Sequence, residues 1–161
     1  PMVLYRGSQD DTEVIKAQPL HESDFHKLPD PKPDKVIWAT DSPTKAELMG
    51  AFAHRKIKQI GYTFPTKESS SLSQVRTSGK LTWTLELEEE INPEERGIEV
   101  FIYELADDTF TLSHDDPLPY EDEYYSLEPS TVPIKRTKFT VEELLQKWER
   151  EDTVEISIKP L

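Results

Sequence analysis

Residues 35–54 constrain the fold more than any other stretch, because a strand, a capped turn and an amphipathic helix follow one another there without interruption. The stretch opens with β-branched and aromatic side chains typical of a buried strand, namely Val36, Ile37 and Trp38. Ser42 suits the N-cap position of a helix, and Pro43 suits its first turn. We therefore predict a helix over residues 43–54. Helical periodicity places Ala46, Met49, Phe52 and Ala53 on one apolar stripe, with Leu48 on its flank.

A second helix is predicted over residues 141–150. Thr140 and Glu143 have the spacing of a capping box, in which each side chain bonds a free backbone amide of the other residue. The side chains that we expect this helix to bury are Val141, Leu144, Leu145 and Trp148.

Short apolar or alternating segments predict strands elsewhere. The alternation is clearest in residues 81–87, whose odd-numbered positions are all apolar. Residues 98–105 carry apolar side chains at both alternating sets of positions, which favours a central strand, and we expect a hairpin with residues 109–113. The other expected strands are residues 2–5, 13–17, 57–64, 132–139 and 154–158.

Together these elements predict an α+β fold, with about seven or eight short, mostly antiparallel strands in a split or two-sheet core and two main helices. The length favours a single domain over residues 1–161. The serine-rich residues 65–80 are expected to form a flexible loop, and the proline-rich residues 19–35 a surface loop.

The formal charge of −13 argues against partners that are bound through many phosphates or through an anionic membrane surface. Duplex nucleic acid and membranes are therefore not expected as partners. Cysteine is absent, which excludes disulfides, thiolate catalysis and cysteine-ligated metals. No basic segment followed by a long apolar stretch opens the sequence, so we expect a cytoplasmic protein.

Three short stretches place polar residues beside aromatic side chains at strand ends, where a ligand ring could stack. They are residues 5–8, 38–42 and 121–126. Each also has a purely structural explanation: a surface ion pair for Arg6, a helix cap for Ser42, and a solvated loop for the acidic run. Their occurrence in one chain is more informative than any one of them.

The order Tyr-Arg-Gly-Ser, then Val-Ile-Trp-Ala-Thr-Asp before a helix, then Glu-Tyr-Tyr-Ser resembles the ADP-ribosyltransferase-like superfamily. The resemblance implies a domain that binds NAD as co-substrate and transfers ADP-ribose to an acceptor, which the sequence does not identify. It implies catalytic roles for Glu123 and Arg6, with Glu121 as the partner acid of a Glu-x-Glu pair. The cofactor-binding residues that it implies are Arg6, Gly7, Ser8, Trp38, Thr40 and Ser42.

The chemistry explains why such residues would be needed. Breaking the bond to nicotinamide develops positive charge on the ribose, which a nearby carboxylate such as Glu123 would stabilise. Arg6 would pair with the diphosphate, and Gly7 would let the backbone approach it. Because the chain is acidic, a second base such as Lys45 or Arg55 would be needed to offset the charge of NAD.

Two other interpretations remain open. A non-catalytic domain of the same fold could bind a basic partner through residues 107–128, which hold eight acids and no Lys or Arg. Metal binding is less favoured, because the ligand spacing fits no EF-hand loop and no standard zinc pattern, and we predict no metal site. The residues considered for such a site are His21, His26, Asp115, Asp116, Glu121 and Asp122.

Overall fold

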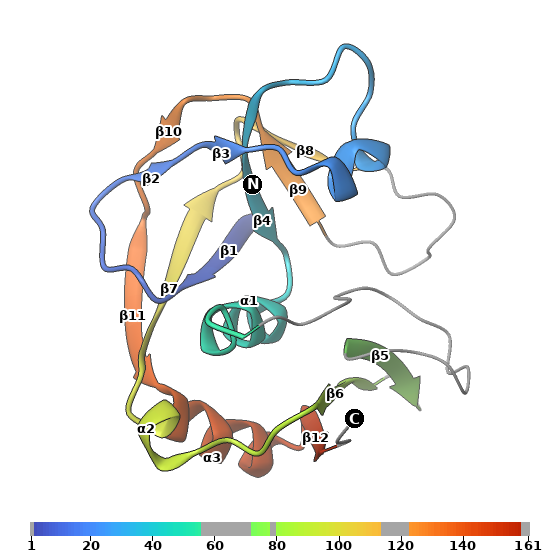
Figure 1. The fold of residues 1–161 in the computed structure, drawn as a ribbon. Helices are drawn as coiled ribbons and strands as arrows, with labels where there is room; N and C mark the ends of the chain where they lie inside the picture. Colours follow the sequence, from blue (N-terminus) through green and yellow to red (C-terminus); the bar gives the residue numbers. More distant parts are fainter. Residues whose placement is uncertain (1, 56–71, 78–79, 114–122, 159–161) are drawn as a thin grey trace. The chain divides into compact units, whose positions relative to one another are not determined.

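The structure is a computed structural model, which describes residues 2–55, 72–77, 80–113 and 123–158 (Figure 1). Helices and mainly antiparallel strands are mixed along the chain, so the predicted α+β class is confirmed. The elements in chain order are β1 (Val3–Ser8), β2 (Ile15–Lys16), β3 (Gln18–Pro19), the 3-10 helix η1 (Glu22–Lys27), β4 (Lys35–Thr40), α1 (Pro43–Ala51), β5 (Leu72–Thr77), β6 (Lys80–Leu87), α2 (Pro93–Arg96), β7 (Glu99–Ala106), β8 (Phe110–Leu112), β9 (Glu123–Ser126), β10 (Ser130–Thr131), β11 (Lys135–Thr140), α3 (Val141–Glu151) and β12 (Val154–Ile158).

The chain forms two compact units, each built from two separate stretches of sequence. Unit 1 comprises Pro1–Gly50 and Val100–Lys138, and unit 2 comprises Ala51–Glu99 and Phe139–Leu161.

The main sheet of unit 1 has the strand order β11-β7-β1-β4-β9-β8, with β3 also paired to β4. β7 lies between β11 and β1, and its side chains are buried on both faces, as the sequence predicted. The predicted hairpin between residues 98–105 and 109–113 is wrong, because β8 pairs with β9. Both edges of β7 are already occupied by β1 and β11, so the strand that follows it has no edge to join.

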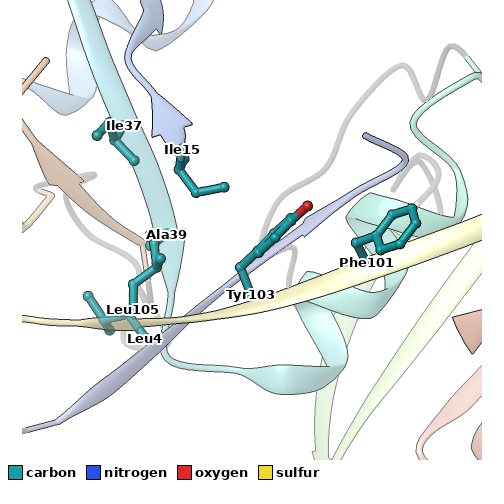
Figure 2. Packing of buried hydrophobic residues seen from close by; sticks show 7 residues of the cluster. All are labelled: Leu4, Ile15, Ile37, Ala39, Phe101, Tyr103 and Leu105. Atoms are coloured by element: carbon teal, nitrogen blue, oxygen red, sulfur yellow. The ribbon is translucent and has the colours of Figure 1, made fainter. Parts of the chain in front are cut away.

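One face of this sheet carries the hydrophobic core of unit 1 (Figure 2). Leu4 pairs with Leu105 across β1 and β7, and both are fully buried. Tyr103 is also fully buried and donates its hydroxyl to the carbonyl of Asp10 at 2.6 Å. The other members of the cluster are Ile15, Ile37, Ala39 and Phe101.

β1 is paired unequally with its two neighbours. It runs antiparallel to β7 over six residue pairs, from Val3↔Ala106 to Ser8↔Phe101, but its register with β4 is the single pair Tyr5↔Thr40. Figure 2 shows β1 and β4 crossing near Leu4 and Ala39 and then diverging. The sheet is therefore split beside Arg6, the residue after Tyr5.

α1 packs against β1 with almost no space between their backbones. A Cβ atom at Gly7 would lie 1.7 Å from the carbonyl oxygen of Ala46, and one at Gly50 would lie 2.6 Å from a methyl group of Val100. Gly7 thus lets a helix approach, whereas the resemblance assigned that closeness to a ligand. Successive residues of a strand alternate between the two faces of a sheet, and Gly7 lies three positions from Leu4 of the core cluster, so α1 covers the face opposite that cluster.

The predicted helix over residues 43–54 begins where expected but ends early, at Ala51. Its buried face also differs from the prediction, because Met49 and Ala53 are exposed while Lys45 and Glu47 are buried. Ala46, Leu48 and Phe52 are buried as expected. Because α1 lies so close to β1, side chains outside its apolar stripe are buried as well.

Unit 2 contains a three-stranded sheet in the order β12-β6-β5, in which β12 runs parallel to β6 and β5 antiparallel to it. The alternation predicted for residues 81–87 is confirmed by the burial of Trp83, Leu85 and Leu87. β5 occupies residues 72–77, part of the segment expected as a flexible loop.

α3 confirms the predicted capping box: the Thr140 hydroxyl accepts from the Glu143 amide at 3.1 Å, and the Glu143 carboxylate accepts from the Thr140 amide at 2.9 Å. The buried side chains of α3 are Val141, Leu144 and Trp148. Leu145 is only half-buried, so it is the one position of the predicted set that differs. The Trp148 ring lies 6.2 Å from that of Phe52.

Several predicted strands are shorter or shifted. The segment 13–17 holds only the two-residue β2, and the strand expected over 132–139 is β11, which begins at Lys135. The predicted loop over 19–35 contains η1. Residues 57–64 lie outside the described residues.

Candidate functional site

All three stretches chosen from the sequence contribute residues to the α1 face of the unit 1 sheet. Thr40 of β4 pairs with Tyr5 of β1 on one side and with Glu123 of β9 on the other, and Trp38 pairs with Tyr125. Paired residues point to the same face, so the Trp38, Thr40, Glu123 and Tyr125 side chains share one surface. Arg6 follows Tyr5 and belongs to the opposite face by alternation.

Glu123 is the electrostatic centre of this surface. Its Oε1 atom lies 3.0 Å from Lys45 Nζ of α1, and its Oε2 atom lies 2.8 Å from Lys27 Nζ of η1. Burial alone would raise the pKa of Glu123, but the positive charges of Lys45 and Lys27 outweigh it and lower that pKa below its usual range. The carboxylate is therefore ionised at neutral pH.

Lys27 makes three different contacts at once. Besides Glu123, its ammonium lies 3.2 Å from Asp24 Oδ1 and 5.7 Å from the centre of the Trp38 ring. Burial would lower the pKa of Lys27, yet Glu123 and Asp24 raise it above its usual value. The Trp38 ring meets the Tyr125 ring edge to face, with 6.2 Å between their centres and 68° between their planes.

Arg6 occupies the split between β1 and β4. Its Nη1 atom donates to the carbonyl oxygen of Trp38 at 2.9 Å, and burial lowers the pKa of Arg6. The guanidinium satisfies a carbonyl of β4 at a place where β1 has left the ladder. No ion pair between Arg6 and a carboxylate is found among the described residues.

The hydroxyl groups predicted to bind a cofactor are used locally as backbone caps. The Ser42 hydroxyl accepts from the Lys45 amide at 3.2 Å, as expected for the N-cap of α1. Thr40 Oγ1 accepts from the Ser42 amide, and the Ser8 hydroxyl accepts from the Asp10 amide, both at 3.0 Å. Each hydroxyl keeps its own hydrogen for donation, so a cap does not by itself prevent a contact with a ligand.

The structure therefore brings Trp38, Thr40 and Glu123 together and places Arg6 beside them. Gly7 and Ser8 serve helix packing and a turn, respectively. Glu121, Asp115, Asp116 and Asp122, which the Glu-x-Glu and metal interpretations used, lie outside the described residues. Within the described ranges, no group of three or more His, Asp or Glu side chains could hold a metal ion.

Lys27 is the residue that the sequence reasoning missed. It stands in a proline-rich segment without periodicity and contacts Glu123 across 96 residues of sequence. No local signal identifies such a contact. Lys45 could have been found, because it is spaced three and seven residues from the buried Leu48 and Phe52 on the same helical face.

Chemically, this surface combines an ionised carboxylate, two ammonium groups and an aromatic pair, and the Arg6 guanidinium lies in the split between β1 and β4 beside it. It could hold a ligand that carries both an anionic group and a ring, with Glu123 placed to stabilise a developing positive charge.

Comparisons with protein-family models, with curated proteins and with solved structures found no match. No helix in the described ranges has both the length and the apolar character needed to span a membrane.

Proposed function

We propose that unit 1 binds NAD and acts as an ADP-ribosyltransferase-like domain on an acceptor that remains to be identified. The observation that supports the proposal most is the position of Glu123, which pairs with Thr40 across β4 and β9 and is held ionised by two lysines. Trp38 and Tyr125 provide an aromatic wall next to it.

The proposed reaction breaks the bond between the ribose C1′ atom and the nicotinamide nitrogen. The electron pair of that bond returns to the pyridinium nitrogen, which leaves neutral nicotinamide and a positively charged ribose. Glu123 stabilises this charge, an acceptor nucleophile attacks C1′, and the nucleophile loses its proton to solvent. Lys45, on the same face as Glu123, would offset the charge of the diphosphate, and Arg6 would reach it through the split between β1 and β4.

Calorimetric titration with NAD, together with nicotinamide release measured by chromatography, tests this proposal. Glu123→Gln should lower the rate of nicotinamide release by about 100-fold or more, since it removes the charge that stabilises the transition state. Glu128→Gln is the matched control, because Glu128 is exposed in the same unit and the change in charge is identical. If the wild-type chain gives no binding heat at millimolar NAD, the proposal is wrong.

A second candidate is a non-catalytic domain that binds a basic protein through its acidic surface. It is favoured by the contacts of Glu123, both of whose oxygens already engage lysines, as in a structural ion cluster. Of the acidic stretch 107–128, the structure describes Asp107, Asp108, Glu123 and Glu128. Capture of a basic partner should weaken steeply as the salt concentration rises from about 50 to about 500 mM, because added salt screens the attraction between exposed charges. Capture that is insensitive to salt would argue against this candidate.

A further inference from the structure

The surroundings of the Lys27 ammonium have the composition of a binding site for a cation. Glu123 Oε2 and Asp24 Oδ1 approach it at 2.8 and 3.2 Å, and the Trp38 ring lies over it at 5.7 Å. Carboxylates combined with an aromatic face are what proteins use to bind ammonium groups of ligands. Here the ammonium belongs to the chain itself.

The two lysines on Glu123 are held very differently. The Lys45 side chain is 5% exposed and comes from α1, whose first turn is fixed by the Ser42 cap. The Lys27 side chain is 14% exposed and comes from η1, which has no fully buried residue. Lys45 is therefore anchored by a packed helix, whereas release of Lys27 from Glu123 and Asp24 would require no buried residue of η1 to move.

We propose that Glu123, Asp24 and Trp38 form a binding site for the alkylammonium group of a ligand, and that Lys27 occupies this site as an internal competitor. When Lys27 leaves, Glu123 and Asp24 lose the positive charge that it supplies. One incoming ammonium group then restores the charge that Lys27 supplied, so the exchange is one for one. The net charge of −13 attracts cationic ligands toward the protein as a whole.

Substitution of Lys27 provides the test, because the apparent affinity of a site is its intrinsic affinity multiplied by the fraction of time for which the internal competitor leaves it free. Lys27→Met removes the internal ammonium group and leaves a flexible, uncharged side chain, so this variant should bind n-butylammonium about 10-fold more tightly than the wild-type chain. Lys27→Arg keeps a cation in the site and should bind as weakly as wild type. Lys16→Met is the control for the loss of one exposed positive charge.

Two probes distinguish the sources of such a cation. n-Butylammonium represents a free amine, and an end-blocked Gly-Lys-Gly peptide represents a lysine of a protein. Tighter binding of either probe to Lys27→Met, lost again when Glu123→Gln is added, supports the site and names its source. Equal affinity of Lys27→Met and wild type for both probes overturns the proposal.

A measurement on the wild-type chain serves if Lys27→Met fails to fold. Trp83 and Trp148 are at most 2% exposed. A change in tryptophan fluorescence on ligand binding should therefore come mainly from Trp38. n-Butylammonium chloride should change this fluorescence saturably, and the same concentration of sodium chloride should not. Identical responses to both salts would overturn the proposal. The inference makes no use of NAD, so NAD binding and ammonium binding can fail independently.

Discussion

Glu95 is the residue whose replacement we expect to destabilise unit 2 most clearly. Its carboxylate receives two bonds from Arg55, from Nε to Oε2 and from Nη2 to Oε1, both at 2.6 Å. His54 Nε2 lies 2.6 Å from Oε2, and the Asn92 amide donates to Oε1 at 3.1 Å. The same Arg55 guanidinium also donates to the carbonyl groups of Glu89 and Glu90. One buried carboxylate thus organises the residues after α1 and the start of α2.

These contacts, above all those from Arg55, lower the pKa of Glu95 from 4.5 to about 2. At 1.36 kcal/mol for each pKa unit, the ionised carboxylate contributes about 3 kcal/mol to the free energy of unfolding at pH 7. Because the folded pKa is the lower one, this contribution is complete well above pH 4.5 and is lost as the pH falls toward 2. At pH 3 it should have decreased by about 2 kcal/mol.

Urea unfolding of the wild-type chain and of Glu95→Gln, followed by circular dichroism at pH 7 and at pH 3, measures this contribution. The two proteins should differ by about 3 kcal/mol at pH 7 and by about 1 kcal/mol at pH 3. Glu94→Gln is the matched control, since Glu94 is its exposed neighbour on α2, and it should change stability by less than about 0.5 kcal/mol. A difference between Glu95→Gln and wild type that stays constant with pH would refute the assignment to ionisation.

Two further substitutions test how the helices are placed. Gly7→Ala should lower the free energy of unfolding by about 3 kcal/mol, because its Cβ would collide with the Ala46 carbonyl of α1. Gly97→Ala, whose Cβ would be 3.6 Å from its nearest neighbour, is the control, and equal effects of the two in thermal unfolding would contradict the packing argument. Thr140→Ala should cost about 1 kcal/mol by removing the N-cap of α3, whereas Thr140→Ser should retain most of that stability. Equal losses in the two Thr140 variants would show that the hydroxyl cap is not responsible.

The predictions that held rest on signals contained within a few neighbouring residues. The Ser42 cap, the Thr140–Glu143 capping box and the alternation of residues 81–87 are all set by local backbone chemistry. The α+β class follows from adding such segments together. These features depend little on contacts with residues that are distant in the sequence.

The predictions that failed depend on partners far away in the sequence. Met49 is exposed and Lys45 is buried because β1 and Glu123, not the apolar stripe of α1, decide which side of the helix is covered. The hairpin after β7 failed because β11, a later strand, takes the second edge of β7. The contact between Lys27 and Glu123 also joins residues that are far apart in the sequence.

For the candidate site, the sequence predicted which strand ends carry its residues, but not how those strand ends meet. Trp38, Thr40 and Glu123 were chosen for their positions beside aromatic residues, and strand pairing does bring them onto one face. Whether this surface acts on NAD is a prediction that awaits the titration described above. The caps made by Ser8, Thr40 and Ser42 show why a hydroxyl near a turn is an ambiguous signal: turn geometry and ligand binding favour the same residue types.

The long register between β1 and β7 has a consequence for how this protein is made. Val3 pairs with Ala106, so β1 leaves the ribosome about a hundred residues before its principal partner is synthesised. Pairing over such a separation makes folding slow, because the intervening chain loses conformational entropy on loop closure before the contacts between β1 and β7 can form. β4, which is synthesised before β7, pairs with β1 through only one residue pair in the folded structure. Synthesis rate and chaperone access should therefore influence the yield of this protein more than its final stability would suggest.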